Sequence, residues 1–107
     1  MLAKGSLMLL VRQVFQARYG RGAELVALFQ EFNTRMREGG ETGPRVRIMT
    51  DASGPFFTVI NEIEVENFAA WEGAFGEAMA QPWMDEWFSR MIPLVESGAR
   101  EFYNIVD

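Results

Sequence analysis

The feature that most constrains the fold is a segment near the start of the chain, residues 7–18, that is apolar on both of its faces. Alternate residues of a strand point to opposite faces of a sheet, so they form two sets. Most members of both sets are apolar: Leu7, Leu9, Val11 and Phe15 in one, and Met8, Leu10 and Val14 in the other. This pattern is typical of a central strand in a sheet whose two faces are both covered.

The segment after this strand has the periodicity of a helix. Tyr19–Gly22 contains two glycines and predicts a turn. Beyond it, apolar residues recur at steps of three and four: Leu25, Leu28, Phe29, Phe32 and Met36. Because this spacing places them on one side of a helix, we predict an amphipathic helix at residues 23–38, ended by Gly39 and Gly40.

A hairpin is predicted next, followed by two helices and a closing strand. Residues 45–51 and 56–65 alternate between two sets as strands do, and Ala-Ser-Gly-Pro between them suits a turn. Asn67 is a good N-cap for the second helix, and Pro82 suits the first turn of a short third helix. Residues 100–106 predict the last strand. The two helices carry all three tryptophans and many of the other large aromatic and methionine side chains: Phe68, Trp71, Phe75, Met79, Trp83, Met84, Trp87, Phe88 and Met91.

The order of these elements predicts an α+β fold of the ferredoxin-like βαββαβ kind, with a four-stranded antiparallel sheet and the helices on one face. The 107 residues have room for one domain, which we assign to residues 1–107. Helices on one face leave the other face open, although Leu10, Val14 and Ile60 belong to it. A second copy of the chain, packed sheet against sheet, would cover this face, so we predict a homodimer.

The order of elements, the extra helix from Pro82 to Met91 and the ending Phe102-Tyr103-Asn104-Ile105 resemble the dimeric α+β barrel superfamily and, within it, the NIPSNAP-like proteins. The resemblance covers nearly the whole chain. It implies that the sheets of two subunits close into a barrel. Because the superfamily also contains haem-degrading enzymes, cofactor-independent monooxygenases, isomerases and proteins without known chemistry, it leaves the activity open.

Composition excludes several kinds of site and partner. The chain has no histidine and no cysteine, so thiolate metal sites, iron–sulfur clusters and histidine-bound haem are excluded, and we expect no metal and no cofactor. The net charge of −5 opposes binding to nucleic acid. The apolar run at residues 7–11 is too short for a secretory signal or a membrane span, so we expect no membrane association and a cytoplasmic protein.

Charged residues in the strands form one candidate ligand-binding set. Hairpin geometry allows Arg45 or Arg47 to face Glu62, and a register with Asp51 beside Phe56 would put Arg45 opposite Glu62 and Arg47 opposite Ile60. If this face lines a cavity between two sheets, Arg12, Arg47 and Glu62 would bind a small acidic or carbonyl-bearing molecule, because an unpaired buried charge is costly. The alternative is that they form solvated cross-strand pairs at the edge of the sheet.

Uncharged polar and aromatic residues form a second candidate set. Asn61, Gln13 and Gln16 lie within otherwise apolar strands, where an amide could orient an oxygen of a substrate. Tyr103 could donate a hydrogen bond to a ligand, or its ring could pack with the hydroxyl group at the rim. Trp71 and the aromatic residues of the last two helices could wall a pocket for a flat ligand, or could belong to the core or to a dimer contact.

Three functions are compatible with these features. The first is a NIPSNAP-like dimeric protein that binds a small apolar or aromatic molecule. The second is a cofactor-independent monooxygenase or isomerase of the antibiotic-biosynthesis kind, in which Asn61, Tyr103 and Arg47 would position and polarise an oxygen. The third is a subunit that docks onto a larger complex through exposed aromatic residues, Trp83, Trp87 and Phe88. The sequence leaves open whether the protein is an enzyme.

Overall fold

The structure is a computed structural model that describes residues 8–39 and 46–106. Its elements are β1 (Leu9–Ala17), α1 (Gly22–Glu38), β2 (Val46–Thr50), β3 (Thr58–Val65), α2 (Phe68–Met79), α3 (Met84–Met91), a short 3₁₀ helix η1 (Ile92–Leu94) and β4 (Val95–Asn104). The predicted α+β fold of the ferredoxin-like βαββαβ kind is confirmed, with α3 and η1 before the last strand.

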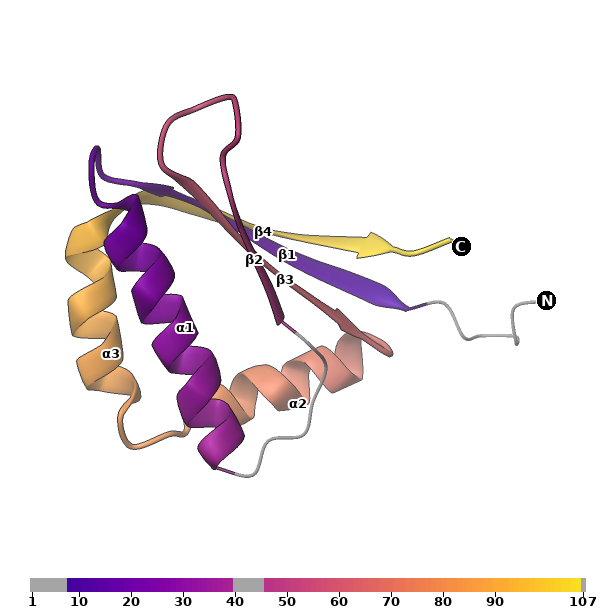
Figure 1. Cartoon of the computed structure of the whole chain (residues 1–107). Coiled ribbons are helices and arrows are strands. Elements are labelled where there is room, and N and C mark those ends of the chain that lie inside the picture. The colour runs from indigo at the N-terminus through magenta and orange to yellow at the C-terminus, as the bar shows by residue number, and fades with distance from the viewer. Residues whose placement is uncertain (1–7, 40–45, 107) are drawn as a thin grey trace.

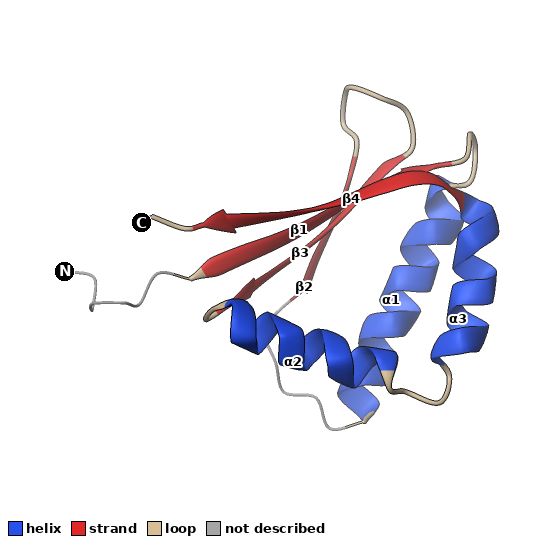
Figure 2. Cartoon of the chain, turned by 180° about the vertical axis from the view of Figure 1, so that it is seen from behind, coloured by secondary structure: helices blue, strands red, loops and turns tan. Residues whose placement is uncertain are grey.

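The four strands form one antiparallel sheet in the order β2-β3-β1-β4, so β1 and β3 are central, and the prediction of a central first strand is confirmed. The three α-helices lie on one face of this sheet, which we term the helix-side face (Figure 1). The view from behind shows α1 and α3 side by side under one end of the sheet and α2 under the other end (Figure 2). No helix of the described residues covers the opposite face, which we term the open face.

Local sequence explains how the helices begin and how they attach to one another. The side-chain Oδ1 of Asn67 accepts a hydrogen bond from the backbone N–H of Ala70 at 2.8 Å, which confirms Asn67 as the N-cap of α2. On α3, the buried indole Nε1–H of Trp87 donates to the carbonyl oxygen of Leu28 at 2.9 Å. This bond and the packing of the indole on Phe29 fix α3 against α1.

The core beneath the helices consists of two separate clusters. The first lies under α1, α3 and η1: Ala17, Leu25, Leu28, Phe29, Val59, Ala78, Met84, Trp87 and Leu94. The second lies under α2, where Leu9, Val11 and Val65 pack with Ile63, Trp71 and Phe102. Because α2 itself buries only Ala78, it covers the sheet less tightly than α1 does.

Several boundaries differ from the sequence predictions: the ends of β1 and β2 by one residue, the end of β4, which is Asn104 and not residue 106, and the starts of β3 and β4. The prediction that Pro82 lies in the first turn of the third helix is wrong, because α3 begins at Met84. β3 begins at Thr58 and not at Phe56, because the chain still turns at Phe57, which has a φ of 60°, and Thr58 N–H bonds to the carboxylate of Asp51. β4 begins at Val95 and not at residue 100, because residues 95–99 pair with β1 through their backbones although most of them are small or polar. The predicted strand ends at Leu7 and Arg45 lie outside the described residues.

The register of the hairpin also differs from the prediction. The structure pairs Arg47 with Glu62 and Met49 with Ile60, so the predicted pairing of Arg47 with Ile60 is wrong by two residues. The reason is that the connection between β2 and β3 spans residues 51–57 and is longer than the four-residue turn assumed. A shift of two residues preserves the alternation of faces, so every side chain keeps its predicted side of the sheet.

Candidate functional site

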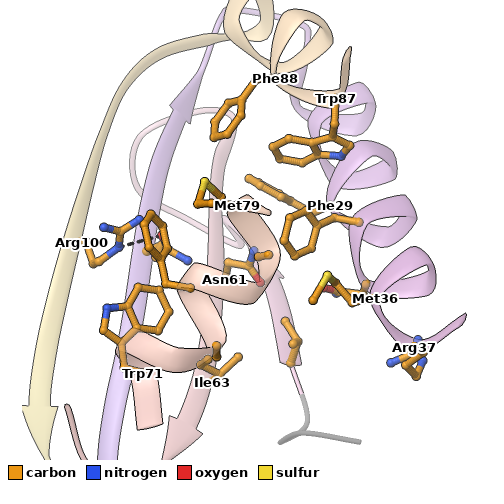
Figure 3. A pocket seen from close by; sticks show the side chains of 17 residues that line it. Phe29, Met36, Arg37, Asn61, Ile63, Trp71, Met79, Trp87, Phe88 and Arg100 are labelled. Carbon is orange, nitrogen blue, oxygen red and sulfur yellow. Dashed lines mark hydrogen bonds between the residues drawn. The ribbon is translucent and has the colours of Figure 1, made fainter. Parts of the chain in front are cut away.

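A cavity of about 340 Å³ lies between the three helices and the helix-side face of the sheet (Figure 3). Its lining includes Phe29 and Trp87 from the first core cluster and Ile63 and Trp71 from the second, so it separates the two. Its volume falls in the range of roughly 300–1,000 Å³ that is typical of small-molecule sites.

The walls of this cavity are mostly apolar, and their large side chains come from all three helices: Phe29, Phe32 and Met36 of α1, Trp71, Phe75 and Met79 of α2, and Trp87 and Phe88 of α3. Ring centroids lie 5.2 Å apart in the pair Phe32–Trp87 and 5.4 Å apart in the pair Trp71–Phe75. Ring faces and edges at these distances suit a flat, apolar ligand.

Three polar side chains line the cavity along the sheet, in a row that crosses β3, β1 and β4. Gln13 is the cross-strand partner of both Asn61 and Arg100. We term these three residues the polar row. On β1, Gln13 interrupts an apolar alternation between Val11 and Phe15, so the row crosses the middle of an otherwise apolar surface.

The side chains of the polar row are held in place to different degrees. Arg100 Nε donates to Gln13 Oε1 at 3.0 Å, and the guanidinium group lies 5.1 Å from the ring centroid of Trp71 and 5.0 Å from that of Phe75 (Figure 3). The Oδ1 atom of Asn61 is buried and has no hydrogen-bond partner among the described residues. The row therefore presents a positioned cation and an unpaired amide oxygen to the cavity.

The open face carries a second row, adjacent to the first on β3, β1 and β4 and extended onto β2, that is fully charged. We term Arg47, Glu62, Arg12 and Glu101 the ionic row. Glu62 accepts from Arg47 Nη2 at 2.7 Å and from Arg12 Nη1 at 2.8 Å, and Arg12 Nε lies 3.4 Å from a carboxylate oxygen of Glu101. Glu62 is only 6% exposed, and the hydrogen bonds from Arg47 and Arg12 lower the pKa of its carboxyl group from the ordinary value of 4.5.

Tyr103 lies at the edge of the ionic row. Its hydroxyl group donates to Glu101 Oε1 at 3.1 Å, and this hydrogen bond to a carboxylate raises the pKa of Tyr103 because it favours the neutral phenol. The ring is half exposed. Tyr103 therefore belongs to the open face and does not line the cavity.

The six candidate ligand-binding residues thus fall into two places. Asn61 and Trp71 line the cavity, whereas Arg12, Arg47, Glu62 and Tyr103 lie on the open face. The aromatic and methionine residues of the last two helices also divide, since Trp71, Phe75, Met79, Trp87 and Phe88 line the cavity and Trp83, Met84 and Met91 do not.

Sequence reasoning noted Gln13 but missed Arg100. The sequence places Arg100 in the last strand. Arg100 is recognised as part of the site only through its pairing with Gln13, which requires the register between β1 and β4. The exposed docking patch of Trp83, Trp87 and Phe88 is not formed, because Trp87 is 3% exposed and the other two rings pack around it or against Phe32.

Two further kinds of site are absent from the described part of the chain. Residues 8–39 and 46–106 hold no group of three acidic, histidine or cysteine side chains that could bind a metal ion. Over the same residues, none of the helices combines the length and the apolar character that crossing a membrane requires.

Together these features define a ferredoxin-like α+β domain with a cavity between its helices and its sheet. No protein-family model matches the sequence, and no curated protein matches it. Solved structures do share the fold. An uncharacterized NIPSNAP domain protein from Burkholderia xenovorans matches with a TM-score of 0.75 and 17% identity over 89% of this chain and 91% of that chain.

Two other solved structures show the same likeness. A NIPSNAP family protein from Agrobacterium tumefaciens has a TM-score of 0.76 and 16% identity, with 90% of each chain covered. A putative antibiotic biosynthesis monooxygenase from Chloroflexus aurantiacus has a TM-score of 0.68 and 14% identity, with 94% of each chain covered. At these identities the likeness shows the fold alone.

Proposed function

We propose that the chain is a NIPSNAP-like protein that binds a small aromatic molecule in the cavity and pairs with a second copy of itself through the open face. The observation that carries the binding function is the convergence of Gln13, Asn61 and Arg100 on an aromatic-walled space of about 340 Å³. The shared fold of the NIPSNAP structures supports the family assignment. We also propose a cytoplasmic location, with which the absence of cysteine is compatible.

The character of the open face supports the pairing. Leu10, Val14, Met49 and Ile60 present apolar side chains there that are only half-buried in one chain. The ionic row beside them contains two arginines and two glutamates, so its charges cancel and it can enter an interface without an excess charge. A two-fold pair places the same surface on both sides and leaves no sheet face uncovered.

The binding function is tested with a neutral two-ring compound, methoxynaphthalene, which has neither an acidic group nor a hydrogen-bond donor. We expect a saturable change of tryptophan fluorescence on titration, with one molecule bound per chain, because Trp71 and Trp87 line the cavity. Equilibrium dialysis measures the stoichiometry independently. Absence of saturable binding by both methods would show that the cavity does not take an aromatic ligand.

A second candidate function is the oxygenation of an aromatic hydroxyl compound. Its support is the same convergence of polar groups, together with the shared fold of the putative antibiotic biosynthesis monooxygenase. Of the three residues that the sequence assigned to this chemistry, Asn61 alone lines the cavity, and Tyr103 and Arg47 lie on the other face.

Oxygen consumption separates the two functions. With dihydroxynaphthalene as substrate, the enzyme hypothesis predicts a rate above that of spontaneous oxidation, and a fall toward that rate in Asn61→Leu. A rate equal to spontaneous oxidation would refute the enzyme hypothesis and leave the binding function standing.

A further inference from the structure

The charged residues that line the cavity have the opposite sign to the net charge of the protein. The chain has a net charge of −5, yet among the described residues 8–39 and 46–106 the charged side chains that line the cavity are Arg37 and Arg100, with no aspartate or glutamate. Two cations without a lining carboxylate among the described residues give the cavity a locally positive potential. The lining therefore attracts an anion.

Arg100 is the better placed of the two arginines to bind that anion. Its Nε is bonded to Gln13, and its guanidinium group lies on the rings of Trp71 and Phe75, so the side chain is oriented before a ligand arrives. The ion pairs among the described residues do not include Arg100. Its two Nη groups match the two oxygens of a carboxylate.

Arg37 lies elsewhere. Figure 3 shows it at the end of α1, on the side of the cavity opposite Arg100 and Trp71. No hydrogen bond or ring contact to a described residue holds its side chain. It contributes to the positive potential, but it is not fixed for a directed bond.

The other unsatisfied group of the polar row is Asn61. Its buried Oδ1 atom lacks a partner among the described residues, and a buried acceptor without a donor is costly. A ligand hydroxyl group would supply the missing bond. Because a hydroxyl both donates and accepts, it satisfies either end of the side-chain amide.

The spacing of Asn61 and Arg100 sets the shape of the ligand. Both pair with Gln13, on its two sides, so their backbones are two strand spacings apart, which is about 10 Å. The aromatic walls enclose the space above the row. A flat two-ring compound with polar groups at its opposite ends fits this arrangement.

We propose that the cavity binds a hydroxylated aromatic carboxylate, with the carboxylate on Arg100 and the ring hydroxyl group on Asn61. This inference rests on the proposed binding function and names its ligand class. The polar row then binds one polar group of the ligand at Arg100 and the other at Asn61, and the aromatic side chains of the walls contact the ring system between these groups.

Four compounds that share a naphthalene ring test the proposal: methoxynaphthalene, naphthol, naphthoate, and a hydroxynaphthoate with its two substituents at opposite ends. Dissociation constants are measured by calorimetry at neutral pH, where the carboxylates are ionised. We expect the carboxylate to strengthen binding about tenfold or more, the hydroxyl group to strengthen it severalfold, and the hydroxynaphthoate to bind most tightly.

Three variants locate the two ends. Arg100→Met is expected to remove the advantage of the carboxylate and keep that of the hydroxyl group, whereas Asn61→Leu is expected to do the reverse. Arg21→Met is the charge-matched control, because Arg21 pairs with Glu24 at the start of α1 and does not line the cavity. Circular dichroism checks that each variant is folded.

The outcomes separate the proposal from the function on which it rests. Failure of methoxynaphthalene to bind would overturn the binding function itself. Binding of all four compounds with equal affinity, or an equal loss of carboxylate affinity in Arg100→Met and Arg21→Met, would overturn the ligand class and leave the binding function standing. Loss of the carboxylate advantage in Arg37→Met instead of Arg100→Met would also overturn it.

Discussion

The two faces of the sheet carry adjacent rows of polar residues that are built in opposite ways. On the open face, the ionic row contains two arginines and two glutamates, and Glu62 is bonded to an arginine on each side. On the helix-side face, the polar row contains one arginine and two amides, and one amide oxygen is unpaired. The first row is satisfied within the chain. In the second row, Arg100 has no carboxylate partner and the buried Asn61 oxygen has no hydrogen-bond partner among the described residues.

The surroundings of the two rows also differ, because one row lies on an uncovered face and the other lies beneath helices. The ionic row lies on a face that no described helix covers and that we propose to pair with the same face of a second copy (Figure 2). The polar row lies under three helices that leave a cavity with aromatic side chains in its walls (Figure 3). The comparison teaches that charge balance between cross-strand neighbours separates a structural network from a ligand site more clearly than the number of charged residues does.

The largest effect is expected from a charge placed among the apolar residues of the open face. Ile60→Asp puts a carboxylate opposite Val14, in the surface proposed to face a second copy. We expect the dimer dissociation constant to rise about a hundredfold or more, because the charge loses its water at the interface. Analytical ultracentrifugation measures it.

Ala27→Asp is the matched control for this experiment, since Ala27 is exposed on α1 and far from the open face. If both variants leave the association state unchanged, the open face does not pair two copies.

The next largest effect concerns the helix-side face alone. Ala74 lines the cavity, and Ala74→Phe would fill part of its space, so we expect loss of methoxynaphthalene binding by about tenfold or more with the dimer unchanged. Fluorescence titration measures the affinity. Ala69→Phe adds the same ring to an exposed position of α2 outside the cavity and should bind normally. Equal binding by the two variants would place the ligand elsewhere.

A smaller effect is expected from Glu62→Gln, which unbalances the ionic row. The pKa of Glu62 is lowered in the folded state, so its contribution to the free energy of unfolding is full above pH 4.5 and is lost as the pH falls through the lower folded value. We expect the variant to lose about 1–2 kcal/mol of that free energy at neutral pH and to approach the wild type in acid.

Urea unfolding at a series of pH values measures this difference. The control is Glu72→Gln, because Glu72 is exposed on α2 and forms no ion pair with any residue that the structure describes. A difference between Glu62→Gln and the wild type that stays constant through the acid range would contradict the pairing.

The smallest effect is expected at the N-cap of α2. Asn67→Ala removes the hydrogen bond to the N–H of Ala70 and should cost about 1 kcal/mol of stability. Because α2 forms one wall of the cavity, the affinity for methoxynaphthalene should fall a few-fold and recover in Asn67→Ser, which can cap the helix. Thermal unfolding and titration of the three proteins measure both effects. An unchanged affinity in Asn67→Ala would show that α2 does not need its cap to hold the wall.

Periodicity and turn chemistry were sufficient to predict the fold. The alternation of β1, the steps of three and four in α1 and the cap at Asn67 are local signals, and the structure confirms each of them. The hairpin register was not predictable in the same way, because it depends on where the loop closes. The positive φ of Phe57 and the bond from Thr58 N–H to Asp51 lengthen that loop.

The site was predictable only in part. Alternation alone places Asn61 and Glu62, which are neighbours on one strand, on opposite faces, so they could not belong to one cavity. The alignment of Arg100 with Gln13 depends on the register of β4, which shifts between Gln16 and Ala17 and cannot be counted from the chain end. The volume of the cavity depends on how closely α2 approaches the sheet, and side-chain periodicity carries no information on that distance.

The central claim is that one face of the sheet binds a small molecule and the other binds a second copy of the chain. Native mass spectrometry of the protein mixed with the hydroxynaphthoate tests both parts in one spectrum. The account predicts a dimer that carries two ligand molecules, with the ligand lost in Ala74→Phe and the dimer lost in Ile60→Asp. A monomer with bound ligand would contradict the role of the open face, and a dimer that never takes up ligand would contradict the role of the cavity.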